Sequence, residues 1–198
     1  MAFQQNGYAI IPQSVTYDEW RGYLLTHGVN VDFSFGNQCW DACALHWYQY
    51  GLKLQTGNGY AYGCWELMRN QNGRPPFELV YGKENIKRGD VIVFDRHGSW
   101  YTGHIGYADE DYNGTNTIKC LGQNQGQGIS SGTPSNIVNQ NLTWFLGAFR
   151  NTNWTVTPPT PPTPSGGSKP TAKRFPWVLY ANKNRRSEER RVGKECRS

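Results

Sequence analysis

Residues 36–51, GNQCWDACALHWYQYG, contain the pattern that decides the fold. Apolar side chains recur along one helical face from Trp40 to Trp47, and the glycine that closes the stretch is a typical helix end. Asn37 is a residue type that caps helix N-termini, so we expect a helix to begin beside it. Cys39 therefore falls in the first turn of a predicted helix.

Two more helices are expected around this segment, and strands follow them. Thr16 and Glu19 form a T-x-x-E capping box, which predicts a helix that runs to about Thr26. A shorter helix is expected from about Tyr62 to Arg69. After residue 90, short β-rich runs predict strands at 91–95, 101–108, 117–123 and 143–150, with a long loop at 125–141. This order predicts an α+β fold, with N-terminal helices packed on a small antiparallel β-sheet.

The composition limits the classes of function that fit the chain. Its 198 residues can form one domain of about 150 residues with an appendage. Charged residues make up only 18% of a chain that has 8 Trp, 12 Tyr and 8 Phe, so we expect recognition through aromatic and polar groups. Trp65, Trp100 and Tyr101 could line a groove, although large aromatics more often fill the core. No run approaches the roughly 18 apolar residues of a membrane span, and no signal peptide is recognised.

A proline- and threonine-rich segment, TVTPPTPPTPSGGSKPT at residues 155–171, is typical of an extended spacer. We expect a folded domain at 1–151, a linker at 152–171, the truncated start of a C-terminal module at 172–185 and a tail at 186–198. The tail, RSEERRVGKECRS, resembles the translation of a sequencing adapter and is expected to be non-native. Without it the formal charge falls from +5 to +3, and no basic stripe predicts a nucleic-acid partner.

Cys39 is the candidate nucleophile. Cysteine attacks as the thiolate, and the N–H groups and dipole at a helix N-terminus lower the pKa of a thiol placed there. Cys43 lies one turn further along the same face, and Cys64 and Cys120 fall within apolar patterns, so these three are expected in the core. Two alternatives stay open. Cys39 is itself an inert core residue, or a set of thiols holds zinc, although the chain has no C-x-x-C pair.

A base and an orienting group must come from elsewhere in the chain. His104, in the segment TGHIGYA, opens a predicted strand after a glycine, which allows another backbone or a substrate to approach closely. The other histidines are less suited by position: His27, His46 and His97. Asn124 ends the next predicted strand and could meet His104 at one end of the sheet if the two strands are adjacent and antiparallel. The alternatives are a structural strand histidine and a plain turn asparagine.

The order of these segments resembles the CHAP family of cysteine, histidine-dependent amidohydrolases and peptidases. GNQCWD is followed by RGDVIVF, GHIGYA, LGQN and FLGAFR, over about residues 15–151. The resemblance implies a papain-like α+β fold in which Cys39 is the nucleophile, His104 the base and Asn124 the group that orients the base. Many members carry a Glu two residues before that Asn, and here the position is Gly122. Asn124 therefore acts alone, or another acceptor takes the place of the Glu.

The resemblance also implies a function. Phage endolysins and bacterial autolysins use such domains, so residues 1–151 are expected to cut an amide bond of peptidoglycan, as an N-acetylmuramoyl-L-alanine amidase or an endopeptidase. The implied partner is a wall of the Gram-positive type, met by a monomer with a C-terminal wall-binding module. The missing signal peptide favours an endolysin made in the host cytoplasm and released through a holin. The alternative is a non-catalytic wall- or glycan-binding module with an inert Cys39.

Polar residues upstream of Cys39 follow the spacing of a calcium loop. Oxygen ligands occupy positions 1, 3, 5 and 7 of such a loop, and a carboxylate closes it at position 12. These positions are Asn30, Asp32, Ser34, Gly36 and Asp41. Some CHAP endolysins bind calcium in this loop, so the resemblance implies a structural ion, with no cofactor required for the chemistry. Phe35 stands where a calcium loop has Gly, which keeps open a plain polar turn.

Overall fold

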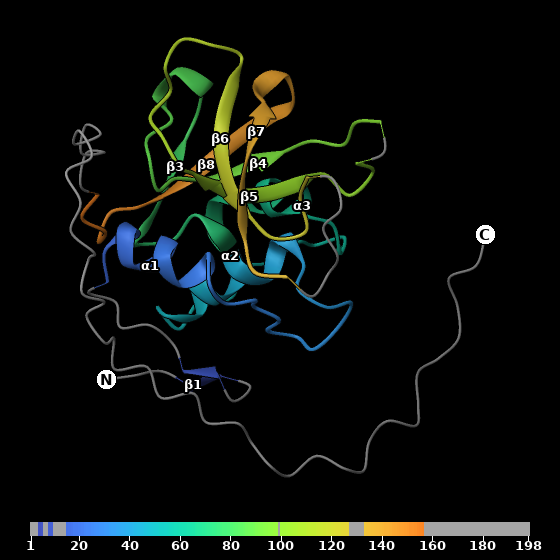
Figure 1. Cartoon of the computed structure of the whole chain (residues 1–198), viewed down its shortest axis with the longest axis vertical. Coiled ribbons are helices and arrows are strands. Elements are labelled where there is room, and N and C mark those ends of the chain that lie inside the picture. Colours follow the sequence, from blue (N-terminus) through green and yellow to red (C-terminus); the bar gives the residue numbers. More distant parts are fainter. Residues whose placement is uncertain (1–3, 6–7, 10–14, 99, 127–132, 157–198) are drawn as a thin grey trace, which may run out of the picture.

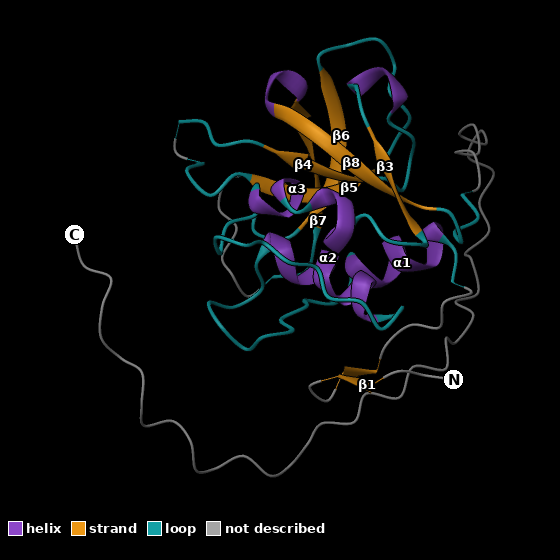
Figure 2. Ribbon diagram, turned by 180° about the vertical axis from the view of Figure 1, so that it is seen from behind, coloured by secondary structure: helices purple, strands orange, loops and turns teal. Residues whose placement is uncertain are grey.

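The computed structural model describes residues 4–5, 8–9, 15–98, 100–126 and 133–156. Helices α1 (Tyr17–Leu24) and α2 (Cys39–Tyr48) lie on one side of a six-stranded sheet (Figure 1). The view from behind shows the same two layers, with the short helix α3 (Gly63–Glu66) next to the sheet (Figure 2). The predicted α+β class, with helices on one side of an antiparallel sheet, is confirmed.

All neighbouring strands of the large sheet are antiparallel, in the order β3-β8-β4-β5-β6-β7. The strands are β3 (Phe77–Val80), β4 (Val91–Phe94), β5 (His104–Ala108), β6 (Thr117–Gly122), β7 (Asn136–Asn141) and β8 (Phe145–Asn151). A separate ribbon pairs β1 (Gln4–Gln5) with β2 (Tyr8–Ala9). Strands β4 and β5 are central and buried along their whole length, so His104 begins a rigid strand.

The sheet separates two apolar cores. The larger core lies under the helices and joins Trp20 of α1 and Trp47 of α2 to Val93 and Tyr107 of the sheet. Ile92 belongs to the smaller core on the opposite face. This division follows from the alternation of side chains across each strand. Helix α2 is thereby fixed against the strands that carry the candidate base.

Helix α1 begins at the predicted capping box. The Thr16 hydroxyl accepts the backbone N–H of Glu19, and the Glu19 carboxylate accepts the backbone N–H of Thr16. Arg21 then donates two hydrogen bonds to the Asp109 carboxylate, at 2.7 and 3.0 Å. The helix is therefore stabilised at its first turn by local bonds and attached to the sheet by an ion pair.

Two strands of the six-stranded sheet, β7 and β3, were not predicted, and neither was the separate ribbon of β1 and β2. β7 lies within the segment expected to be a long loop, because its sequence NIVNQN is rich in asparagine and has low strand propensity. It nevertheless pairs with β6 over its whole length, from Asn136 to Asn141. The short strand β3 pairs with β8. In both strands tertiary pairing outweighs weak local propensity.

Two helix boundaries also differ from the prediction. α3 ends at Glu66 because the side chain of Asn72, in the following π-helical turn Met68–Asn72, donates to the carbonyl of Cys64 at 2.7 Å. The predicted cap of α2 was Asn37, but the cap residue is Gln38, and the side chain of Asn37 donates to the Thr133 carbonyl at 3.1 Å.

Short 3₁₀ turns occur at Lys83–Asn85 and Leu142–Trp144.

The folded domain continues past the predicted boundary at residue 151. Trp154 is buried, and its ring stacks on His46 with the centroids 3.9 Å apart. The linker from residue 157 onward, the predicted module start at 172–185 and the tail at 186–198 lie outside the described residues. Within the described part of the chain, no helix has the length and apolar character needed to span a bilayer.

Candidate active site

Cys39 is the first residue of α2, and a network of backbone bonds fixes the turn before it. The N–H of Gln38 donates to one carboxylate oxygen of Asp41 at 2.7 Å, and the N–H of Val31 donates to the other at 2.9 Å. Burial raises the pKa of Asp41 to about 6, although these N–H bonds oppose the rise. The loop and the helix start are thus held together by a single carboxyl group.

The Cys39 thiol is partly buried and lies beside strand β5. Burial raises its pKa to about 11, and the backbone N–H groups of Ile105 and Trp40 only partly oppose this rise. The sequence predicted a lowered pKa at this helix N-terminus, and that expectation is wrong. Desolvation of the thiolate outweighs the first-turn N–H groups. At neutral pH Cys39 is therefore a neutral thiol.

The contact with Ile105 brings Cys39 to the strand that begins with His104. N–H directions alternate along a strand, and the N–H of Ala108 points toward β4, where it donates to a backbone carbonyl at 2.8 Å. The N–H of Ile105 therefore points toward β6, which pairs with β5 at Tyr107 and Ala108. Cys39 occupies the space beyond the end of this pairing.

His104 is buried, with 3% of the residue exposed. Its ring packs against Trp100, with the centroids 4.8 Å apart, and against Phe94 at 6.4 Å. Burial lowers the pKa of the imidazole to about 4, although a hydrogen bond to Gln125 opposes this shift. At neutral pH His104 is therefore an uncharged base.

Gly103 sets the backbone path into His104. Its φ is +64°, and a Cβ at this position would lie 2.5 Å from the Phe94 carbonyl oxygen and 2.8 Å from Tyr62 Cβ. The sequence predicted that this glycine allows close approach, and the neighbour is the backbone and side chain of Tyr62. Only glycine meets both requirements without displacing the strand.

Gln125 orients His104, and its own amide orientation is fixed by other bonds. Its Nε2 donates to the carbonyls of Cys120 and Asn136, each at 2.9 Å, so Oε1 must face the imidazole. That oxygen lies 2.8 Å from His104 Nε2 and also accepts a bond from Gln140 at 3.2 Å. His104 Nε2 therefore carries the proton, which leaves Nδ1 with a free lone pair to act as the base.

The absence of a side chain at Gly122 makes room for this arrangement. A Cβ there would lie 3.2 to 3.3 Å from the carboxamide of Gln125. Gln125 thus folds back over Gly122 and reaches the Cys120 carbonyl. The acceptor that substitutes for the family glutamate is therefore Gln125, three residues after the position where that glutamate was expected.

The predicted contact of Asn124 with His104 is wrong by one residue. Strands β5 and β6 are adjacent and antiparallel as expected, but Asn124 has φ +50°, which turns the chain out of the strand. Its Nδ2 donates to Gln38 Oε1 at 2.9 Å, and the residue is exposed. Asn124 therefore binds the residue before Cys39, and Gln125 takes the place at the imidazole.

Gln123 completes the connection between the two halves of the site. Its side chain accepts the N–H of Val29 at 2.6 Å and donates to the carbonyls of Val29 and Gln38, each at 2.9 Å. We call residues 123–125 the bridging tripeptide, because its first two side chains bind Gln38 and its third binds His104. Sequence reasoning singled out only Asn124, and a run of three amide residues after a strand was the available signal.

The other histidines have structural contacts. His27 Nδ1 lies 3.2 Å from the Tyr23 carbonyl oxygen at the end of α1, as expected for a helix terminus. His46 is buried in the larger core, where burial lowers its pKa well below the usual value. His97 stacks on Trp144, with the ring centroids 4.9 Å apart.

The loop before Cys39 fits a calcium ion in part. Oδ1 of Asn30 is buried and makes no hydrogen bond to the described residues, so one acceptor is unused. The Asp32 carboxylate is close enough to contribute to the raised pKa of Asp41, and a divalent cation would relieve this repulsion. Gly36 has φ +73°, and Ser34 donates its N–H to Asp32 at 2.8 Å. Both carboxylate oxygens of Asp41 already accept N–H bonds, and each retains a lone pair.

No group of three or more His, Cys, Asp or Glu side chains among the described residues is arranged to hold a metal. This finding gives no support to the zinc alternative. Burial raises the pKa of the Cys43, Cys64 and Cys120 thiols, as expected for core residues. All three have no exposed surface.

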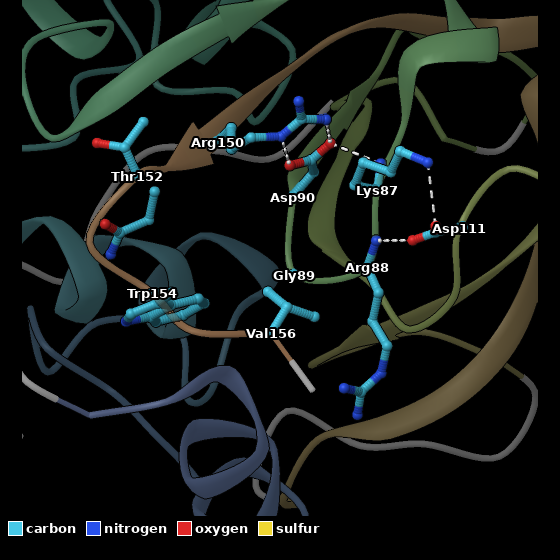
Figure 3. A pocket seen from close by; sticks show the side chains of 10 residues that line it. Lys87, Arg88, Gly89, Asp90, Asp111, Arg150, Thr152, Trp154 and Val156 are labelled. Carbon is cyan, nitrogen blue, oxygen red and sulfur yellow. Dashed lines mark hydrogen bonds and ion pairs between the residues drawn. The ribbon is translucent and has the colours of Figure 1, made fainter. Parts of the chain in front are cut away.

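A pocket of about 510 Å³ is lined by residues that include Asp90 and Arg150 (Figure 3). Because Asp90 precedes β4 and Phe94, the partner of His104, ends it, the pocket lies at the opposite end of β4 from His104. Asp90 is four positions, or about 13 Å of extended strand, from Phe94, which pairs with His104. Asp90 forms an ion pair with Arg150 at 2.7 Å, and Lys87 pairs with Asp111 at 3.1 Å. These charges satisfy one another, and the pocket is separate from Cys39.

Comparison with known proteins identifies the family of this region. A family model of the CHAP domain matches residues 28–124. This region of the chain is a CHAP domain. The match includes the calcium-like loop, Cys39 and His104, and it ends within the bridging tripeptide of the CHAP domain.

Two known proteins are similar to the chain. The D-alanyl-L-alanine endopeptidase of Streptococcus phage B30 is 36% identical over 115 residues, which cover 56% of this chain and 25% of that protein. The chain thus spans about a quarter of the length of this curated relative. The crystal structure of the wild-type endolysin LysIME-EF1 matches with a TM-score of 0.55 and 24% identity, over 69% of this chain and 64% of that chain. The second comparison supports the CHAP fold of the chain.

Proposed function

We propose that the CHAP domain is a peptidoglycan hydrolase that cuts an amide bond of the bacterial cell wall, with Cys39 as nucleophile and His104 as base. The bridging tripeptide is the observation that carries this proposal. It connects the turn before Cys39 to the imidazole of His104 through three consecutive side chains. The name of the phage relative, an endopeptidase, supports the same class of substrate.

The reaction follows from the positions of the protons. The Cys39 thiol transfers its proton to Nδ1 of His104 as the sulfur attacks the amide carbonyl carbon, and the backbone N–H of Cys39 stabilises the oxyanion. The imidazolium then protonates the leaving amine, which leaves a thioester. Water, deprotonated by His104, attacks the thioester, and the carboxylic acid product departs with regeneration of the thiol. Gln125 acts as the positioning residue that keeps the proton on Nε2.

The pKa values favour proton transfer during attack over a preformed ion pair. The pKa of Cys39 is raised to about 11 and that of His104 lowered to about 4, so the resting pair is neutral. Charge separation then occurs only when the oxyanion also forms, where first-turn N–H groups can stabilise it. A neutral resting state also limits oxidation of the thiol, because the thiolate is the reactive form.

Lysis of purified Gram-positive walls by single variants tests the assignment. We expect Cys39→Ala and His104→Ala each to reduce the rate by at least about 10²-fold, with an unchanged far-ultraviolet circular dichroism spectrum. Cys43→Ala is the matched control, since it removes a buried thiol one turn further along α2. Lysis by the Cys39 variant at the wild-type rate would overturn the proposal.

The bond that is cut is identified by mass spectrometry of the released fragments. An N-acetylmuramoyl-L-alanine amidase frees the amino group of the first stem residue, whereas an endopeptidase creates an amino group within the peptide. We propose endopeptidase cleavage first, because the phage relative bears that name. Release of intact stem peptides with a free N-terminal alanine would assign the amidase reaction instead.

The raised pKa of Cys39 favours a second candidate, a non-catalytic wall- or glycan-binding module. The two candidates differ in how the thiol responds to its neighbour. If His104 is the base, His104→Ala slows alkylation of Cys39 by iodoacetamide. An inert thiol reacts equally slowly in both proteins, and the chain then sediments with walls without releasing fragments.

We also propose a structural calcium ion held by the loop before the nucleophile. The proposed ligands are Asn30, Asp32, Ser34, Gly36 and Asp41. Such an ion neutralises the two carboxylates and orders the loop, while the proton transfers remain with Cys39 and His104. Added calcium should raise the melting temperature, and Asp32→Asn should abolish this rise. Equal melting temperatures in calcium and in chelator would remove the ion from the proposal.

The biological setting proposed for the chain is that of a phage endolysin that acts on a Gram-positive wall. The endopeptidase of Streptococcus phage B30 and the fold shared with an endolysin support this setting. We further propose a monomeric catalytic unit, release to the wall at lysis, and a separate C-terminal module for wall binding. Sedimentation analysis of the purified chain tests the monomer, and a dimer at micromolar concentration would contradict it.

A further inference from the structure

We propose that an exposed aromatic surface beside His104 binds the peptide stem of the wall polymer, with Arg96 pairing a stem carboxylate. This inference rests on the proposed function for the identity of its ligand. We call the surface the tyrosine shelf, and it consists of Tyr60, Tyr62, Tyr101 and Arg96. None of these residues has a role in the proton transfers described above.

The tyrosine shelf is continuous with the candidate active site. The N–H of Tyr62 donates to the carbonyl of Thr102 at 3.3 Å, and its Cβ is the atom that a side chain at Gly103 would meet. Trp100, which packs on the His104 ring, accepts the N–H of Gly103 at 3.0 Å. The shelf therefore borders the turn that leads directly into the base.

Two rings of the shelf are unusually open for aromatic residues, and the third, that of Tyr62, is only 9% exposed. Tyr101 is 70% exposed and Tyr60 is 41% exposed, and their rings meet edge to face at 6.3 Å. Tyr60 also lies over Tyr62, with the centroids 6.0 Å apart and the rings 22° from parallel. Contiguous exposed aromatic surface beside a reactive group is typical of a binding site.

Arg96 adds a positioned cation to this surface. Its guanidinium lies 4.6 Å from the centroid of the Tyr62 ring and donates to the Tyr62 hydroxyl at 3.4 Å. The side chain remains 60% exposed, and its ion pair with Asp95, at 3.7 Å, is an exposed contact of the kind that contributes little. A guanidinium held against a ring is preorganised for bidentate binding of a carboxylate.

The chemistry of the proposed substrate selects the peptide stem over the glycan strand. Both amide bonds considered above are bounded by stem peptide on at least one side, so peptide must occupy the surface next to His104. Stem peptides carry free carboxylates, whereas the sugars of the glycan strand present hydroxyl and acetamido groups. A cation on the shelf is complementary only to the peptide.

Of the three aromatic residues singled out from the sequence, two lie at or beside the shelf and one packs against the sheet. Tyr101 belongs to the shelf and Trp100 connects it to His104. Trp65 is different, because it packs over Gly147 of β8 and meets Phe149 edge to face at 5.4 Å. Arg96 and Tyr60 were not singled out from the sequence, because the contacts that each makes with Tyr62 appear only in the folded chain.

The experiment measures binding of a synthetic stem peptide to the full chain carrying Cys39→Ala, by isothermal titration calorimetry at low salt. We expect Arg96→Gln and Tyr101→Ala each to weaken binding about tenfold. Lys87→Gln and Tyr81→Ala are the matched controls, since their side chains are comparably exposed elsewhere in the fold. Amidation of the peptide carboxylates should weaken binding to the parent chain and leave the Arg96→Gln variant unaffected.

The outcomes separate this inference from the proposed function. Equal affinities for the parent chain and both shelf variants would overturn the shelf, whatever the result for wall lysis. Preferential binding of a peptide-free glycan fragment at Tyr101 would also overturn it. If the wild-type chain fails to lyse walls but binds the stem peptide in a way that depends on Arg96, the proposed hydrolase function is contradicted and the tyrosine shelf is supported. In an active chain, Arg96→Gln should raise KM and leave kcat unchanged.

Discussion

Gln125 has no freedom in how it meets His104, because its amide nitrogen is committed to two backbone carbonyls. A side chain fixed in this way selects one tautomer of the imidazole, and the base depends on that tautomer. The neighbouring Asn124 acts on the other half of the site, through the side chain of Gln38. Gln125 therefore positions the imidazole of His104, whereas Asn124 positions the residue before Cys39.

Replacement of Gln125 by alanine should reduce kcat more than replacement of Asn124. Gln125→Ala removes the acceptor of His104 Nε2 and one donor from each of two carbonyls, Cys120 and Asn136. We therefore expect roughly a tenfold or greater loss of kcat and about 1–3 kcal/mol less stability. Asn124→Ala removes one exposed contact and should cost severalfold less in kcat. Initial rates of wall lysis and urea denaturation measure both effects. A larger kcat loss in Asn124→Ala would reverse the assignment of the two residues.

The pH dependence of kcat/KM should follow the lowered pKa of His104. Protonation removes the lone pair of Nδ1, so activity is expected to persist well below pH 6 and to fall as the pH approaches about 4. Gln125→Glu places a carboxylate beside the imidazole, which stabilises the cation and should move the acidic limb to higher pH. Profiles of the two proteins between pH 3 and 8 would measure this shift, and coincident acidic limbs would contradict it.

The residue-level error in the sequence prediction has a simple cause. Alternation along a strand predicts which side chains share a face, and this reasoning placed Asn124 at the imidazole. The left-handed backbone at Asn124 breaks the alternation, so the side chain that contacts His104 is that of Gln125. Such a conformation is uncommon for residues other than glycine, but asparagine adopts it more readily than most. The alternative of a plain turn asparagine was therefore the local signal for this turn. Cys39 and His104 were easier to find, since they fall at element starts that have strong local signals.

At the scale of elements, the turn between β4 and β5 determines where the chain enters β5 at His104. Two of its glycines have positive φ, Gly98 at +50° and Gly103 at +64°. Only Gly103 is also confined by neighbouring atoms, whereas Gly98 has nothing within 4 Å of a Cβ. A substitution at Gly98 therefore tests the effect of backbone strain alone, whereas one at Gly103 adds a steric clash.

We expect Gly103→Ala to be more damaging than Gly98→Ala. Left-handed strain alone should cost about 1–2 kcal/mol of stability in either variant. At Gly103 the clash with Phe94 and Tyr62 should add roughly 1–3 kcal/mol and displace His104, so the rate of wall lysis should also fall. Equal stabilities and equal rates for the two variants would show that the contact with Tyr62 is unimportant.

The elements themselves were predictable wherever a local signal existed. The capping box at Thr16 and the amphipathic face of α2 predicted both major helices, and the apolar runs predicted β4, β5, β6 and β8. β7 was not predictable, because its asparagine-rich sequence has strand geometry only when paired with β6. The bridging tripeptide depends on this pairing too, since Asn136 and Gln140 of β7 contact Gln125.

At the scale of the whole molecule, the end of the domain is fixed by Trp154. Its ring lies flat on His46 of α2 and within 5.7 Å of Tyr17 of α1, so the last described segment closes the larger core against both helices. The proline-rich composition placed the boundary at residue 151, because a single tryptophan in a polar segment gives no packing signal. The folded domain therefore requires the chain through at least Trp154.

Trp154→Ala should destabilise the entire domain. Removing a buried ring of this size leaves a cavity, and we expect a loss of about 3–5 kcal/mol in the free energy of unfolding. Trp144→Ala, at a side chain that is 40% exposed, should cost about 1 kcal/mol or less and serves as the control. Guanidinium denaturation measures both, and similar midpoints would show that Trp154 packs only loosely.

The bridging tripeptide has a consequence for when the proposed active site can assemble during synthesis. Gln123 meets Gln38 across 85 positions of sequence, so a ribosome must synthesise the chain past the end of β6 before the thiol of Cys39 and the imidazole of His104 can be held in place. A nascent or prematurely terminated polypeptide would hold both reactive groups and remain inert. Catalytic competence would then arrive abruptly, near the end of the domain's synthesis.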